Sequence, residues 1–160
     1  MFPYENILVP HAGTKTGNIA LKHAIDIAKE CDATITILSV VEQVSIPLDL
    51  TFNPKQSQMV EELQYAPRSF KKLLYKKMEK NILLCKREKI NTVIKITHGN
   101  PDEEIMRFYH NNPVDLIVMA KKRYSVGKSL LNLGSNTRKI LEHVSCPILI
   151  VDNLEEQKND

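Results

Sequence analysis

The sequence predicts an α/β protein built on one parallel β-sheet. Five short aliphatic and β-branched runs are separated by longer segments in which apolar residues recur every three or four positions. This alternation is typical of repeated β–α–β units, whose helices cover a parallel sheet. With 160 residues, 42% of them hydrophobic, the chain is the size of one domain with a single core. The predicted strands are Asn6–Pro10, Thr34–Val41, Thr92–Thr97, Leu116–Met119 and Pro147–Val151.

Two helices are predicted in the first half of the chain. The first has an inward face made by Ile19, Ala20, His23, Ala24, Ile27, Ala28 and Cys31. On that face His23 is expected to be a hydrogen-bonded core residue. The second repeats the pattern with Phe70, Leu74, Met78, Ile82 and Cys85, and lysines occupy much of its remaining surface. A solvated lysine face explains this pattern better than a nucleic-acid site, because no aromatic residues are interleaved with the lysines.

Two further helices are predicted in the second half. The third begins at Pro101 with Asn100 as its cap, since proline suits the first helical turn and asparagine the capping position. Its inward face is Ile105, Met106, Phe108 and Tyr109. The fourth begins near Ser135, and its inward residues are Ile140, Leu141 and Val144.

The remaining segments bound the domain, which we expect to span residues 1–152. Residues 42–67 contain Pro47, Pro54 and Pro67 with only a weak helical pattern, which indicates a long surface excursion. Residues 153–160 are polar and acidic and are predicted to be a disordered tail.

Composition excludes several classes of protein. The net charge of +3 is modest, and no apolar run approaches the roughly 20 residues that span a bilayer. The N-terminus has no basic region of the kind that opens a signal peptide, so a cytoplasmic location is expected. The three cysteines, Cys31, Cys85 and Cys146, lack metal or redox spacing and are expected to be buried free thiols. No sequence motif predicts a metal site.

A candidate anion site follows the fourth predicted strand. Gly134 and Ser135 stand at the start of a helix, where free backbone N–H groups and the helix dipole attract negative charge. Cations precede them at Lys121, Lys122, Arg123 and Lys128, and further donors follow at Asn136 and Thr137. The alternative is a solvated basic turn, with Ser135 or Asn136 serving only as the helix cap.

The order of the predicted elements and three stretches of sequence resemble the universal stress protein family, and the resemblance covers essentially the whole chain. The three stretches are NILVP near the N-terminus, GNPDEEI with VDLIVMA, and LGSNTRKILEHVSCPILIV at the end. The resemblance implies a Rossmann-like, doubly wound sheet of five parallel strands in the order 3-2-1-4-5, with helices on both faces. It also implies a role in stress or adaptation and a homodimer paired through the last strand, at Ile148, Leu149, Ile150 and Val151. An apolar edge strand would itself favour such pairing.

Family members that bind ATP have an acidic residue after the first strand and a loop of the form Gly, two residues, Gly, nine residues, Gly, Ser or Thr. In this chain Gly134 and Ser135 match the end of that loop, but Lys121 and Tyr124 replace its first two glycines. The acidic position falls on Ala12, within Pro10-His11-Ala12. Side chains with a Cβ disfavour the backbone conformations that such glycines adopt, which argues against ATP binding in the usual mode. In the ATP-binding members, backbone groups after the second strand hold the base of the nucleotide. That position maps to Val40, where backbone contacts would allow any residue type.

Two functional hypotheses follow. The leading one is a non-catalytic cytoplasmic homodimer that acts by binding protein partners. The alternative is a sensor in which Lys121, Lys122 and Lys128 hold ATP, AMP or another phosphorylated metabolite, with residues 42–67 as a lid. An enzyme is not expected, because His11 and His98, which follow the first and third strands, have no recognisable nucleophile or orienting acid beside them in the sequence.

Overall fold

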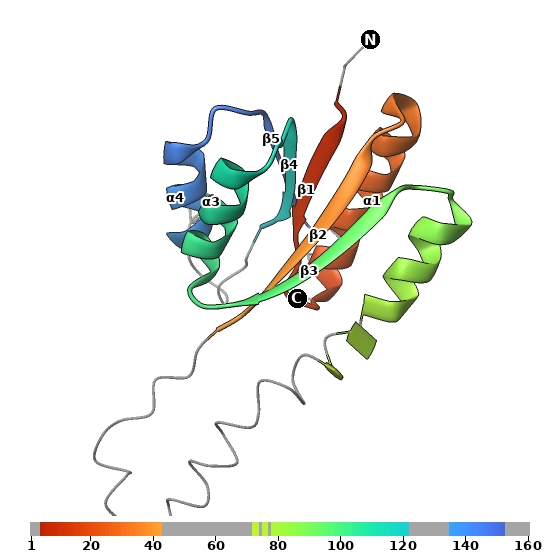
Figure 1. The fold of residues 1–160 in the computed structure, drawn as a ribbon, viewed down its shortest axis with the longest axis horizontal. Helices are drawn as coiled ribbons and strands as arrows, with labels where there is room; N and C mark the ends of the chain where they lie inside the picture. The colour runs from red at the N-terminus through yellow and green to blue at the C-terminus, as the bar shows by residue number, and fades with distance from the viewer. Residues whose placement is uncertain (1–3, 43–71, 74, 77, 122–134, 153–160) are drawn as a thin grey trace, which may run out of the picture.

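The predicted α/β fold is confirmed in the computed structural model, which describes residues 4–42, 72–73, 75–76, 78–121 and 135–152. Five parallel strands form one sheet in the order β3-β2-β1-β4-β5 (Figure 1). The strands are β1 (Asn6–Pro10), β2 (Thr34–Val41), β3 (Thr92–His98), β4 (Leu116–Ala120) and β5 (Ile148–Val151). Each lies within a residue of its predicted bounds, and β3 and β5 are the two edge strands.

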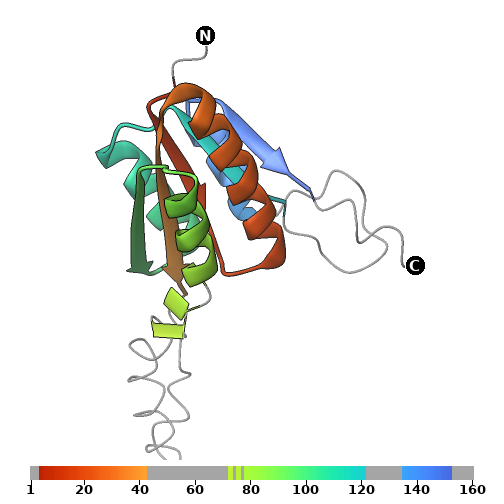
Figure 2. The same ribbon diagram turned by 90° about the vertical axis from the view of Figure 1, so that its right-hand side faces the viewer.

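Helices cover both faces of this sheet. They are α1 (Lys15–Cys31), a helix at 78–87 that also includes residues 72–73 and 75–76, α3 (Pro101–Asn111) and α4 (Ser135–His143). Figure 2 shows α1 and the helix at 78–87 side by side in front of the sheet. The other two helices, α3 and α4, pack against each other on the opposite face. This doubly wound arrangement places the loops after β1 and β4 side by side at the carboxyl ends of these strands, where such folds bind ligands.

The core has two parts, one on each face of the sheet. On the α1 face it includes Ile7, Val9, Leu21, Ile35, Ile37, Met78, Cys85 and Val118. On the α3 face it includes Leu8, Leu38, Ile105, Ile117, Met119 and Ile140. The central strands β1 and β4 contribute to both parts, because alternate side chains of a strand point to opposite faces.

The predicted inward faces of the helices are correct at their centres and wrong at some flanks. Ala20, Ala24 and Ala28 are buried in α1 as predicted, but His23 is exposed, and Leu21 and Ile25 are buried instead. In α4 the predicted Ile140 is buried, whereas Leu141 is 40% exposed. The 3.6-residue repeat predicts the centre of the buried face of a helix. Which residues beside that centre are also buried depends on the neighbouring elements that pack against them.

The turn into α3 is shaped by a glycine. Gly99 has φ +143°, and its N–H donates to the carbonyl oxygen of Val41 at 3.0 Å. Asn100 occupies the capping position as predicted, but its side chain makes no capping hydrogen bond. The carbonyl oxygen of Asn100 instead accepts the first helical hydrogen bond, from the Glu104 N–H at 2.9 Å.

All three cysteines are free, but only Cys85 is fully buried, and burial raises the pKa of its thiol. None of the helices in the described ranges is long and apolar enough to cross a membrane. The predicted excursion, apart from Glu42, and the predicted tail lie outside the described residues, as do Phe70 and Leu74.

Candidate functional site

Several predicted ligand-binding residues that the structure describes lie at the ends of β1 and β4. The strand order reverses between these two strands, and a crevice at such a reversal is the usual ligand site of open α/β sheets. Pro10 ends β1, His11 and Ala12 follow it, Lys121 follows β4, and α4 begins at Ser135. Lys122, Lys128 and Gly134 lie outside the described residues, as do the side chains of Ser135 and Asn136.

His11 is a buried polar residue at the end of β1. Both of its ring nitrogens have partners: Nε2 lies 2.9 Å from Asn18 Oδ1, and Nδ1 accepts from the Gly13 N–H at 2.9 Å. Because Nδ1 must accept, Nε2 carries the proton and the imidazole is neutral. Burial lowers the pKa of His11, and the Asn18 hydrogen bond only partly offsets that effect.

A polar network continues from His11 to the neighbouring helix. Asn18 Oδ1 also accepts from Asn81 Nδ2 at 2.8 Å, so one amide oxygen joins the loop after β1 to the helix at 78–87. Ser39 Oγ donates to the carbonyl oxygen of His11 at 2.6 Å, and the His11 N–H donates to Leu38 at 2.9 Å. The His11 backbone is thus tied to β2 and its ring to two helices.

Two glycines permit this geometry. A Cβ on Gly17 would lie 3.1 Å from His11 Nε2 and 3.2 Å from Thr14 Oγ1, so the absent side chain lets α1 approach the ring. Thr14 caps the same helix by accepting from the Gly17 N–H at 3.0 Å. Gly13 has φ +72°, a conformation that glycine adopts readily. Neither glycine was singled out in the sequence, because close approach to His11 is visible only in three dimensions.

The pH dependence of stability should report on buried His11. Its pKa is lowered in the folded state, so the folded chain binds fewer protons than the unfolded chain. The His11 contribution is therefore present above about pH 6.5 and is lost as the pH falls below that value, with a slope of at most about 1.4 kcal/mol per pH unit. Urea unfolding between pH 5 and 8, compared between wild type and His11→Gln, isolates this slope. Equal pH dependence in the two proteins would refute it.

Lys121, the first of the predicted cations, is paired with a carboxylate of the chain itself. Its Nζ lies 3.6 Å from Asp152 Oδ2, and its backbone N–H donates to the carbonyl oxygen of Val151 at 2.8 Å. The side chain is 18% exposed. The positive charge of Lys121 is thus offset at the end of the β4–β5 ladder.

The other candidate residues that the structure describes offer little polar surface. Ala12 is exposed and stands where an acidic side chain was sought, so no acceptor projects from that position. Val40 is partly buried in β2 and packs against the core on the α3 face. Thr137 is buried in the first turn of α4. No group of three potential metal ligands occurs among the residues described.

An ion pair that the sequence did not reveal fixes α4 against α3. Asp102, in the first turn of α3, is buried, and its Oδ2 lies 2.5 Å from Lys139 Nζ in α4. The hydrogen bond from Lys139 lowers the pKa of Asp102, and the same bond raises the pKa of Lys139. Acidic residues are common in the first turn of a helix, so the pairing of Asp102 with Lys139 could not be recognised in the sequence.

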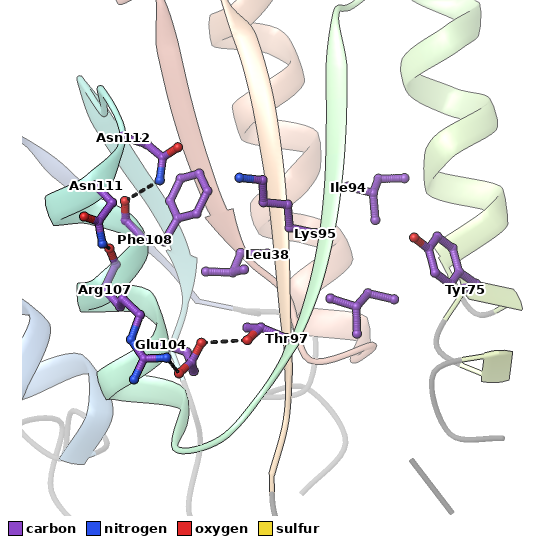
Figure 3. Close-up of a pocket in the computed structure, with 11 residues that line it drawn as sticks. Leu38, Tyr75, Ile94, Lys95, Thr97, Glu104, Arg107, Phe108, Asn111 and Asn112 are labelled. Carbon is purple, nitrogen blue, oxygen red and sulfur yellow. Dashed lines mark hydrogen bonds and ion pairs between the residues drawn. The ribbon is translucent and has the colours of Figure 1, made fainter. Parts of the chain in front are cut away.

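A groove of about 470 Å³ lies along the edge strand β3 (Figure 3). On the α3 side of β3, Thr97 Oγ1 donates to Glu104 Oε2 at 2.6 Å, and Arg107 Nη1 lies 2.5 Å from Glu104 Oε1. Lys95 Nζ stands 4.8 Å from the centre of the Phe108 ring. None of these residues was a predicted site residue, because the groove forms only when β3 and α3 come together.

Comparison with known proteins agrees with the fold described above. The family model described as "Universal stress protein family" matches residues 3–152. The chain belongs to the universal stress protein family. A relative from Methanocaldococcus jannaschii, universal stress protein MJ0531, is 31% identical over 151 residues, covering 92% of this chain and 82% of its own length. A second relative, from Methanothermobacter thermautotrophicus, is 28% identical over 148 residues, covering 92% of this chain and 95% of its own length.

Several solved structures share the fold of this chain. Protein MJ0577 has a TM-score of 0.74 and 24% identity, with 94% of this chain and 97% of that chain covered. A universal stress protein in complex with cAMP has a TM-score of 0.62 and 17% identity, covering 94% and 98% of the two chains. A family member from Arabidopsis thaliana with AMP bound has a TM-score of 0.61 and 16% identity, covering 98% and 97%. At these identities the likeness shows the fold alone.

Proposed function

We propose that this universal stress protein acts in stress adaptation as a non-catalytic cytoplasmic homodimer that works by binding other proteins. The observation that carries the proposal is that two polar side chains at the usual ligand site are already bonded to other residues of the chain. His11 has both ring nitrogens bonded within the chain, and Lys121 is paired with Asp152. Side chains committed in this way contribute little to holding a ligand.

The same engagement argues against catalysis at this site. A general base needs a free lone pair within reach of a substrate, but His11 Nδ1 is occupied by the Gly13 N–H. Ala12 supplies no acid to orient a base or a metal-bound water. Among the described residues of this site, His11 is a neutral, buried imidazole with no lone pair left for a substrate.

The homodimer would form through β5, the edge strand next to β4. The Ile117 N–H donates to Pro147 at 3.0 Å and the Lys121 N–H donates to Val151 at 2.8 Å. Because alternate residues of a strand face the same neighbour, Ile148 and Ile150 direct their backbone groups away from β4. Leu149 adds a side chain that is 36% exposed. Open backbone groups beside an exposed apolar residue suit pairing with a second copy.

Proline at Ile150 should separate the dimer. This residue directs its N–H outward, so Ile150→Pro removes a donor from the open edge and spares the ladder with β4. We expect the mass measured by light scattering to fall from that of a dimer to that of a monomer. Ile94→Pro, which makes the same change at the outward-facing centre of β3, is the matched control and should leave the dimer intact. A dimer that survives Ile150→Pro with its circular dichroism unchanged would refute pairing through β5.

A second candidate is a nucleotide sensor, favoured by the start of α4. This helix begins at Ser135 and has no acidic residue in its first turn, so its positive dipole end is not offset by side chains there. The AMP and cAMP complexes of structural neighbours motivate the choice of ligands. Calorimetric titration with ATP, ADP and AMP, with and without magnesium, tests it. Micromolar binding that Lys121→Ala weakens and Lys86→Ala does not would favour the sensor, whereas no heat at millimolar nucleotide would favour the partner-binding role.

A further inference from the structure

The outer edge of β3 directs backbone hydrogen-bonding groups away from the sheet. The Ile35 N–H donates to Asn91 at 2.8 Å and the Gly99 N–H donates to Val41 at 3.0 Å, which fixes the phase of the ladder with β2. Since residues alternate, Thr92, Ile94, Ile96 and His98 direct their N–H and C=O groups outward. Within the described part of the chain no strand borders this edge. Such an edge is a template for another extended segment.

The groove along β3 extends to both sides of that edge. Figure 3 shows Ile94 directed toward Tyr75 on one side of the strand, and Lys95 and Leu38 directed toward Phe108 on the other. Ile96 shares the side of Ile94, because it is two residues further along the strand. The first side is therefore apolar, made by Tyr75, Ile94 and Ile96, and the second side contains the cations Lys95 and Arg107.

We propose that the open edge of β3 is a docking site for an extended segment of another protein in which apolar and acidic residues alternate. A strand added to an edge places successive side chains on opposite faces, so alternate residues would meet the two sides of the groove. Apolar residues fit the side of Tyr75 and Ile94, and acidic residues fit the side of Lys95 and Arg107. The inference rests on the proposed partner-binding function and names the class of partner.

The charges on the α3 side support an acidic partner. Glu104 is buried and accepts from both Thr97 and Arg107, so its charge is committed within the chain. Arg107 remains 66% exposed and has further N–H donors for a carboxylate. Lys95 is exposed and stands over the Phe108 ring. These three ionised side chains sum to one positive charge, with both cations accessible from the groove.

A second copy of the chain fits this edge less well. Antiparallel pairing of two identical edges uses a twofold axis perpendicular to the sheet, which keeps the same face of both copies on the same side. Lys95 and Arg107 of one copy would then adjoin the same residues of the other. Like charges on neighbouring strands oppose pairing, so the partner must supply the acidic residues.

Synthetic peptides test the docking site with the full chain. A fluorescent ten-residue peptide alternating valine and glutamate is titrated with the protein, and binding is followed by anisotropy. We expect saturable binding that weakens at least tenfold when lysine replaces every glutamate, and at least tenfold with Lys95→Glu. Lys86→Glu, on the exposed surface of the helix at 78–87, is the matched control and should change binding less than twofold. Equal affinity for the glutamate and lysine peptides would overturn the proposal.

Backbone pairing is tested without changing the protein. One peptide carries N-methyl groups on the backbone nitrogens of all its valines, and a second carries them on those of all its glutamates. In an added strand only one of these two sets faces β3, so one peptide should lose binding and the other should retain it. Equal effects of the two sets, whether both peptides bind or neither does, would contradict strand addition.

The two edges of the sheet are distinguished by the pair of proline variants. Ile94→Pro should abolish peptide binding and leave the mass of the dimer unchanged, whereas Ile150→Pro should do the reverse. A dimer that binds no peptide would reject the β3 site alone. Peptide binding by a wild-type monomer would support the β3 site while rejecting the proposed homodimer.

Discussion

Leu8→Ala is expected to lower the free energy of unfolding by about 3 kcal/mol. Leu8 lies in the central strand β1 with none of its surface exposed, and it packs with Leu38, Ile105 and Ile117 between the sheet and α3. Shortening the side chain removes apolar contacts and leaves a cavity that a five-stranded sheet cannot close by moving a single loop.

Urea unfolding monitored by circular dichroism measures this change. Leu83→Ala is a matched control, because Leu83 is 58% exposed and the same truncation there should change the free energy of unfolding by less than about 0.5 kcal/mol. Similar losses in the two variants would contradict the assignment of Leu8 to the core.

Gly99→Ala is expected to cost about 2–3 kcal/mol of unfolding free energy. The backbone of Gly99 has φ +143°, a conformation that side chains with a Cβ rarely adopt. The added Cβ would also lie 3.2 Å from both Cγ and Oε1 of Glu104. Glu104 cannot easily withdraw, because Thr97 and Arg107 hold its carboxylate.

The neighbouring residue supplies the control for Gly99. Asn100 caps α3 only by its backbone, so Asn100→Ala should change the free energy of unfolding by less than about 0.5 kcal/mol. Thermal unfolding of both variants compares the two costs directly. A Gly99→Ala variant as stable as wild type would mean that the turn after β3 relaxes to another conformation.

The central strands β1 and β4 were predictable because burial on both faces leaves a strong local signal. Runs such as Leu116–Met119 are apolar throughout, and Pro101 marks a helix start by the geometry of one residue. The order of the strands came from the family resemblance of the whole chain. The predicted burial of residues at the flanks of helix faces, such as His23 and Leu141, was wrong, since their burial depends on how far neighbouring elements extend.

The sites were less predictable, because their geometry depends on contacts between residues far apart in the sequence. The sequence indicated His11 only as a polar residue after a strand, and nothing in it indicated that Asn18 and Asn81 would form the network that encloses the ring. The groove likewise requires Lys95 and Phe108, which are thirteen positions apart, to meet across β3 and α3. A charge pattern along the chain does not reveal such pairings.

The positions of β3 and β5 at opposite ends of the sheet have a consequence for assembly. Two copies joined through β5 would share one continuous sheet whose outermost strands are both β3. Such a dimer would be bivalent, with identical docking edges facing away from each other. A partner with two suitable segments could occupy both β3 edges of one dimer if the linker between its segments spanned the dimer, and it would then be held by avidity. A partner with a shorter linker would instead connect separate dimers into chains.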